Sequence, residues 1–281
     1  MRLSISRVGA KLQRITGWSR PINVTIAGEP FVIDGSCGAR GELNDYDYAW
    51  LRALARGQRC VLDIGSNIGV TALLLARHMD PDGTCILADL WSDNLQLAAR
   101  NLYRARLLAR AAFARLRIDD CNHAGVSRLA ANIVARGAEL HGAMEQLRAL
   151  DPGTPSCTID HLCAAMSLTP DLMKVDVEGA EQAVLRGASE TVARCQPAIQ
   201  VELHSFPPST MRANAQHTLE WCAARRYRMW YLASGAPVEI AEQLAHRGRC
   251  HVLLLPSNAP YPSGLLDIPQ NGNGWRSGLD G

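Results

Sequence analysis

The chain has 281 residues, of which 47% are hydrophobic and 20% are charged, and its formal net charge is +2. These values are typical of a globular protein and provide no bulk electrostatic attraction for a nucleic acid, so we expect no such partner. The nine cysteines form no C-x-x-C pair, which argues against a zinc cluster or a disulfide framework. We expect mostly buried thiols in a reducing, cytoplasmic setting. No apolar run approaches the roughly 20 residues that span a bilayer.

Residues 1–57 are expected to precede the main domain as a basic segment, a hairpin and a lead-in helix. Residues 1–20 contain five basic side chains and no acidic one, and their apolar residues have near-helical spacing. Such a segment could contact an anionic membrane surface, although a docking helix or a partly ordered terminus is the simpler interpretation. Residues 22–33 predict two short strands around 28–30, and residues 46–56 predict an amphipathic helix.

Residues 60–69, C-V-L-D-I-G-S-N-I-G, are an apolar run followed by a glycine-rich turn. The apolar run predicts a buried strand. Gly65 and Gly69 allow a tight turn in which the backbone approaches a ligand closely. Residues 70–77 then predict a helix whose first N–H groups lie beside the turn. The pattern therefore predicts a strand–turn–helix unit that holds a nucleotide-like ligand.

The acid and the asparagine of this turn bear on the identity of the ligand. A dinucleotide fingerprint reads G-x-G-x-x-G, whereas this chain has Asn67 in place of the middle glycine and Asp63 two residues before the first. A carboxylate repels a pyrophosphate but suits a ligand with an ammonium group and hydroxyls, such as S-adenosylmethionine (SAM). A plain structural turn remains the alternative. The predicted cofactor-binding residues of the turn are Asp63, Gly65, Ser66, Asn67 and Gly69.

The next unit repeats the strand-to-helix pattern. Residues 84–88 predict a second strand, which ends in Asp89 about 20 residues after the glycines, where related folds hydrogen-bond a ribose hydroxyl. We therefore expect Asp89 to bind the ribose. The alternative is that Asp89 caps the helix predicted over Ser92–Arg104, but Ser92 is the better N-cap candidate.

The middle of the chain is harder to interpret. Residues 110–118 predict a third strand, although their alanine and arginine content also permits a helix. Asp119 follows and could accept a hydrogen bond from the adenine amino group, or could be an ordinary loop charge. Residues 122–157 are expected to be a variable, substrate-facing insertion, even though 127–150 have helical composition. Residues 158–166 predict a short helix, capped by Thr158 or Asp160.

Polar side chains lie at or just after the carboxyl ends of the next two predicted strands, at 172–177 and within 196–203. Ligands of doubly wound sheets bind at the carboxyl ends of the strands, so these side chains should lie at the mouth of the same pocket. They are Asp176, Glu178, Glu202 and His204.

The last elements complete the predicted sheet. Residues 212–226 predict an amphipathic helix, and residues 228–232 and 250–255 predict two final strands that form an antiparallel hairpin at the sheet edge. Residues 258–281 are rich in proline, glycine, serine and asparagine, so we expect a flexible tail there.

Together these motifs resemble the FkbM-type SAM-dependent methyltransferases. The family's D-I-G-x-N-x-G loop matches residues 63–69, and its acid at the end of the second strand matches Asp89. Its K-[IV]-D-[VI]-E-G-x-E…L-x-G-A block, the most specific of these signals, matches residues 174–188, and V-E-L-H at 201–204 resembles a further family element. Asp89 departs from the more usual glutamate, and Leu90-Trp91 from the usual proline and polar residue.

The resemblance implies an α/β fold, namely a Rossmann-like, doubly wound, mostly parallel seven-stranded sheet with an antiparallel edge strand. Residues 58–257 would form the SAM-binding domain. The resemblance also implies an O-methyltransferase that modifies a hydroxyl of a sugar, glycan or secondary metabolite. Two alternatives are a non-catalytic SAM-fold binding protein and an NAD-dependent oxidoreductase, the latter disfavoured by Asn67 and by residues 174–188.

Methyl transfer to an oxygen requires a nearby group that removes the hydroxyl proton. His204 is the first candidate for this base, because its ordinary pKa lies near neutral pH, and Asp176 and Glu202 lie at the same edge. Asp176 could also contact the cofactor. The carboxylates of Asp176, Glu178 and Glu202 could instead bind Mg²⁺, since hard cations prefer oxygen ligands.

Overall fold

The structure of the chain is a computed structural model. It describes residues 19–38, 41–43, 47–123, 125–150, 153–205 and 209–268. The predicted basic segment thus lies almost entirely outside the described residues, as does the end of the predicted tail. None of the described helices combines the length and the apolar character that a bilayer crossing requires.

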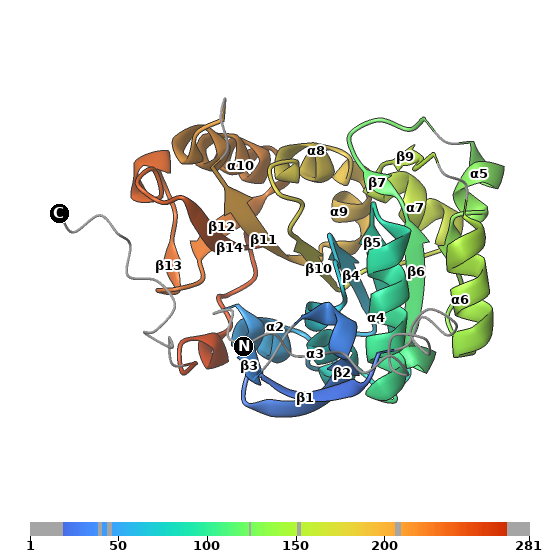
Figure 1. The fold of residues 1–281 in the computed structure, drawn as a ribbon. Helices are drawn as coiled ribbons and strands as arrows, with labels where there is room; N and C mark the ends of the chain where they lie inside the picture. The colour runs from blue at the N-terminus through green and yellow to red at the C-terminus, as the bar shows by residue number, and fades with distance from the viewer. Residues whose placement is uncertain are drawn as a thin grey trace.

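A nine-stranded sheet forms the centre of the described residues (Figure 1). In spatial order its strands are β13 (Ala236–Pro237), β12 (Tyr227–Tyr231), β14 (Arg249–Pro256), β11 (Ala198–His204), β10 (Leu172–Val175), β4 (Cys60–Ile64), β5 (Thr84–Asp89), β6 (Ala111–Arg115) and β8 (Ile133–Val134). The five strands from β11 to β6 are parallel. This arrangement confirms the predicted Rossmann-like α/β class.

The position of the antiparallel strand differs from the prediction. β14 is antiparallel to both of its neighbours, but it lies between β11 and β12 rather than at the edge. The chain runs from β11 through α10 (Met211–Arg225) to β12. The later strand β14 then lies between β11 and β12. The two-residue strands β8 and β13 occupy the edges, each antiparallel to its neighbour, so the predicted seven strands become nine.

Helices cover both faces of the sheet (Figure 1). One layer contains α2 (Tyr48–Leu54), α3 (Val70–His78), α4 (Ser92–Arg104) and α6 (Leu140–Ala149), and the other contains α5 (Val126–Ala130), α7 (Ile159–Met166), α8 (Glu181–Arg186), α9 (Ser189–Cys195) and α10. Alternate side chains of β4 enter opposite layers: Val61 packs with the first, whereas Leu62 and Ile64 pack with the second. Six of the nine cysteines are buried, as predicted.

A small sheet precedes the central one. β1 (Pro21–Ile26) and β2 (Glu29–Asp34) form the predicted hairpin, and β3 (Gly41–Leu43) pairs in parallel with β1. The two loop residues, Ala27 and Gly28, both have positive φ, as a tight right-twisting hairpin requires. Short 3₁₀ turns occur at Gly35–Cys37, Leu108–Arg110, Ala241–Gln243 and Ser263–Leu265.

Three segments differ from their predictions. The third strand is interrupted at Leu116, and its second part, β7 (Arg117–Ile118), pairs with β9 (Ser156–Cys157). Residues 122–157 also contribute β8 to the sheet and α6 to the layer around α4, so this region is partly framework. The tail predicted from residue 258 is wrong up to 268, because Leu265 is buried and the ring of Tyr261 packs 5.2 Å from that of Trp230.

Candidate active site

A pocket of about 550 Å³ lies at the carboxyl ends of β4, β5 and β10. Its lining residues include Ile64, Gly65, Asn67, Asp89, Leu90, Trp91, Asn94, Ile118, Asp176 and Glu178. The turn after β4 is anchored to β5, since the N–H groups of Gly65 and Ser66 donate to the carbonyl of Ala88. A larger hollow of about 810 Å³ beside the end of α4 contains none of the predicted site residues.

Gly65 is required where β4 meets this pocket. Its φ is +77°, and a Cβ there would lie 1.8 Å from the carbonyl oxygen of Asp176. No other residue permits that approach of the two strand ends. Gly69 is needed for packing, because its Cβ would lie 2.7 Å from that of Ala98 in α4. Gly69 therefore brings α3 and α4 together and does not line the pocket.

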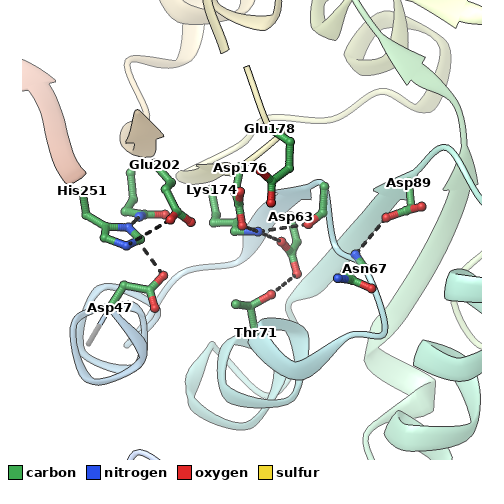
Figure 2. Close-up of polar contacts among 12 residues, drawn as sticks. Asp47, Asp63, Asn67, Thr71, Asp89, Lys174, Asp176, Glu178, Glu202 and His251 are labelled. Atoms are coloured by element: carbon green, nitrogen blue, oxygen red, sulfur yellow. Dashed lines mark hydrogen bonds and ion pairs between the residues drawn. The ribbon is translucent and has the colours of Figure 1, made fainter. Parts of the chain in front are cut away.

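Asp89 lies at the pocket wall and organises the adjacent backbone. Its Oδ2 accepts the N–H of Asn67 at 2.9 Å (Figure 2). Its Oδ1 accepts the N–H of Trp91 at 2.8 Å and Nδ2 of Asn94 at 3.1 Å. Trp91, not Ser92, is the residue that precedes the first turn of α4, so the predicted Ser92 cap is wrong. The position of Asp89 is compatible with a ribose ligand, and that role stays a prediction.

Asp63 is buried behind the turn, contrary to the expectation that it contacts the cofactor. Its side chain is 0% exposed; Oδ2 accepts the Thr71 hydroxyl at 2.8 Å, and Oδ1 lies 3.4 Å from Nζ of Lys174 (Figure 2). Lys174 faces Asp63 in the register of β10 and β4, and its Nζ also donates to the carbonyl of Gly65 at 3.0 Å. This ion pair therefore supports the turn from beneath and does not line the pocket.

Two other predicted cofactor residues also lie outside the lining. The Ser66 side chain is buried, and its hydroxyl has no hydrogen-bond partner among the described residues. Asp119 follows β7 and lies 3.0 Å from Nε of Arg117. Arg117 and Ile118 line the pocket but Asp119 does not, so the loop charge alternative fits this geometry better.

His204 ends β11 and is surrounded by four carboxylates. Its Nδ1 lies 2.9 Å from Oε1 of Glu181, and its Nε2 lies 3.5 Å from Glu178, 3.6 Å from Glu202 and 3.9 Å from Asp176. Burial lowers the pKa of this imidazole, but the hydrogen bond to Glu181 and the surrounding negative charge raise it overall. The ring is only 5% exposed. A buried imidazole that favours the protonated form is a poor general base, which counts against the role expected for His204.

Protein cations balance two of the four carboxylates around His204. Nζ of Lys174 lies 3.1 Å from Asp176, and Nε of Arg249 lies 2.9 Å from Glu202. Burial raises the pKa of Asp176, but the charge and the hydrogen bond of Lys174, together with the positive charge around it, outweigh burial and lower the pKa overall.

The positions of these cations argue against the predicted Mg²⁺ site. Ligand atoms of Asp176, Glu202 and His204 lie within 4.8 Å of one another, a set that includes His204 in place of the predicted Glu178. Mg²⁺ requires oxygen ligands whose charge is available to it, whereas these carboxylates already face Lys174, Arg249 and His204. The cluster therefore does not fit Mg²⁺.

The structure adds His251, which the sequence analysis missed. It lies on β14, opposite Glu202 in register, and is 1% exposed. Nε2 of Gln200 lies 2.7 Å from its Nδ1, while its Nε2 lies 3.7 Å from Glu202 (Figure 2). Burial, reinforced by the charge of Arg249, lowers the pKa of His251 to about 3. The signal in the sequence that could have indicated His251 is its position as the polar residue within the otherwise apolar run 250–255.

Comparison with known proteins identifies the family. Residues 63–229, more than half of the chain, match the Methyltransferase FkbM domain. No curated protein sequence matches.

Solved structures with similar folds include three methyltransferases. Methyltransferase FkbM from Methylobacillus flagellatus KT is 15% identical over 71% of this chain and 43% of that chain, with a TM-score of 0.45. The O-methyltransferase TomG from Streptomyces achromogenes, involved in tomaymycin synthesis and solved with SAM, is 17% identical over 76% and 81%, with a TM-score of 0.43. An O-methyltransferase from Bacillus cereus, solved with SAH, is 13% identical over 75% and 80%, with a TM-score of 0.41.

The domain match extends from the glycine-rich turn to β12 and so includes every strand that lines the pocket. The chain belongs to the FkbM methyltransferase family and is a SAM-dependent methyltransferase.

Proposed function

We propose that this methyltransferase modifies a hydroxyl group of a sugar, glycan or secondary metabolite. The observation that carries the proposal is the presence of carboxylates from two strand ends in one pocket lining: Asp89 is the last residue of β5, and Asp176 and Glu178 follow β10. The family match sets aside the NAD-dependent alternative. The hydroxyl acceptor and its chemical class are our inference.

The pocket has properties that suit SAM. Its volume of about 550 Å³ is within the usual range for small-molecule sites. Ile64, Leu90 and Ile118 provide apolar surface for an adenine ring, and the presence of Asp89 in the lining supports its proposed role as acceptor for ribose hydroxyls. Bound SAM supplies an electrophilic methyl group.

Proton removal is assigned to the carboxylates that line this pocket. Asp176 is 26% exposed but faces Lys174, which favours its charged, weakly basic form. The Glu178 side chain is 74% exposed and lines the same wall. We therefore assign the role of proton acceptor to Glu178, with Asp176 orienting the ligand. His204 and Glu202, which we expected to act directly, lie behind this wall and support it.

The test is a methyl-transfer assay with labelled SAM and a panel of acceptors. The panel contains neutral sugars and glycans, phenolic and aliphatic alcohols, amines and thiols, with binding of SAM and NAD⁺ measured by calorimetry in parallel. We expect SAM to bind, NAD⁺ not to bind, and label to enter hydroxyl acceptors. Transfer only to amines or thiols would contradict the oxygen acceptor. SAM binding without transfer to any class would support the non-catalytic alternative.

A further inference from the structure

The pocket wall after β10 contains a strained turn. Glu178 has a φ of +53° and Gly179 a φ of +103°. The first value lies in the left-handed region that non-glycine residues rarely adopt. Such a conformation persists only where the surroundings hold it in place. Since Glu178 lines the pocket, whatever holds this turn also sets the shape of the pocket wall.

Glu181, the first residue of α8, makes the contacts that hold the turn. Its side chain is 2% exposed, and a single oxygen, Oε1, accepts both the N–H of Gly179 at 2.8 Å and Nδ1 of His204 at 2.9 Å. The carboxylate thus connects the turn after β10 with the end of β11. α8 is itself anchored, because Nε2 of Gln182 donates to the hydroxyl of Thr218 in α10 at 2.8 Å.

The bond to Glu181 also determines the orientation of His204. A carboxylate can only accept, so Nδ1 of His204 carries a proton and Nε2 is the atom that faces Glu178 and Asp176. Glu181 therefore holds the pocket wall in two ways. It accepts the Gly179 N–H directly, and it orients the imidazole that lies beside Glu178. It does not line the pocket itself.

The geometry points to Glu181 as a positioning residue for SAM binding: its carboxylate oxygen holds the Glu178–Gly179 turn and the His204 ring in the arrangement that forms one wall of the pocket. This inference concerns the cofactor pocket and does not depend on the identity of the acceptor. According to this inference, SAM affinity depends on the position of the Glu181 oxygen and not on its negative charge.

Two variants separate geometry from charge. Glu181→Gln keeps an oxygen at the same distance from the main chain but removes the charge, whereas Glu181→Asp keeps the charge on a side chain one methylene shorter, which cannot reach both donors. Calorimetry measures the Kd of SAM and of SAH for each variant, and thermal unfolding confirms that each is folded. The control pair is Glu190→Gln and Glu190→Asp, since Glu190 is an exposed glutamate in the first turn of the neighbouring helix α9.

We expect Glu181→Gln to bind SAM within about threefold of the wild type and Glu181→Asp to bind about tenfold more weakly, the loss that follows from one broken hydrogen bond. Both Glu190 variants should match the wild type. Wild-type affinity in Glu181→Asp would overturn the inference, as would an equal loss in Glu181→Gln. A lowered melting temperature with unchanged Kd would reduce Glu181 to a stabilising role. A wild-type protein that binds no SAM would overturn the cofactor assignment as well.

Discussion

The ammonium group of Lys174 lies 3.4 Å from the carboxylate of Asp63, and both side chains are buried between the paired strands β10 and β4. Lys174 also lies 3.1 Å from Asp176 at the pocket wall. Burial lowers the pKa of this lysine, but the charges of Asp63 and Asp176 outweigh burial and raise the pKa, so the ammonium stays charged. One buried cation thus supports both the glycine turn and the pocket wall.

Removing this cation should destabilise the fold. We expect Lys174→Met to lower the free energy of unfolding by about 3–5 kcal/mol, because it leaves two carboxylates without their buried partner. Chemical denaturation measures the change. The control is Arg186→Met, which breaks the 2.7 Å pair with Asp120 on the surface, where solvent screening makes the expected loss much smaller. Equal losses in the two variants would contradict the structural role of Lys174.

Asp89 should contribute to cofactor affinity. Asp89→Asn retains the size of the side chain but replaces one acceptor oxygen with a donor amide that faces the N–H of either Asn67 or Trp91. We expect SAM to bind about 10–100-fold more weakly, as for the loss of one charged hydrogen bond. Calorimetry with SAM tests this change. Asp93→Asn, at an exposed position in the first turn of the same helix, should leave the affinity unchanged.

Glu178 should affect turnover rather than cofactor binding. If Glu178 accepts the hydroxyl proton, Glu178→Gln should lower kcat by about 100-fold or more, which is the usual contribution of a general base. The Kd of SAM should change by less than about threefold, since Gln preserves the shape of the wall. Steady-state kinetics on an acceptor found in the panel gives kcat, and calorimetry gives the Kd of SAM, with Glu239→Gln at an exposed position as the control. Unchanged kcat would exclude this role for Glu178.

Buried His251 should make stability depend on pH. Its pKa is about 3 in the folded protein and about 6.5 when unfolded, so between these values only the unfolded state binds the proton. The contribution of neutral His251 to the free energy of unfolding should therefore be fully present above about pH 6.5. Below that pH the free energy of unfolding should fall by up to about 1.4 kcal/mol for each pH unit. Denaturation at several pH values should show a shallower slope in His251→Gln. His141→Gln, which replaces a histidine that is 86% exposed, should leave the slope unchanged.

Magnesium should have little influence on this enzyme. Lys174, Arg249 and His204 already face the carboxylates of the proposed metal cluster, so a dication would have to displace protein cations. We expect the Kd of SAM and the turnover rate to change by less than about twofold on treatment with EDTA. A large loss that added Mg²⁺ restores would contradict this expectation and would identify Asp176, Glu202 and His204 as a metal site.

Much of the fold follows from local patterns. Short apolar runs bounded by glycine and polar turns predict β4, β5 and the main part of β11, and α4 has the predicted bounds Ser92–Arg104. Residues 122–157 gave weaker signals, because their strands have only two residues and no sequence period can be read from so short a segment. Their place in the fold depends on pairing with β6 and β7.

Residue type and order along the chain were enough to predict the strand–turn–helix unit, the family and the edge of the sheet at which Asp89 and Asp176 lie. Contacts between strands decide which of these polar groups face the pocket. Asp63 is buried in the central strand β4, where Lys174 of β10 faces it and balances its charge. His251 reaches Glu202 because β14 enters between β11 and β12. Such contacts depend on strand order and register, which a local pattern does not contain.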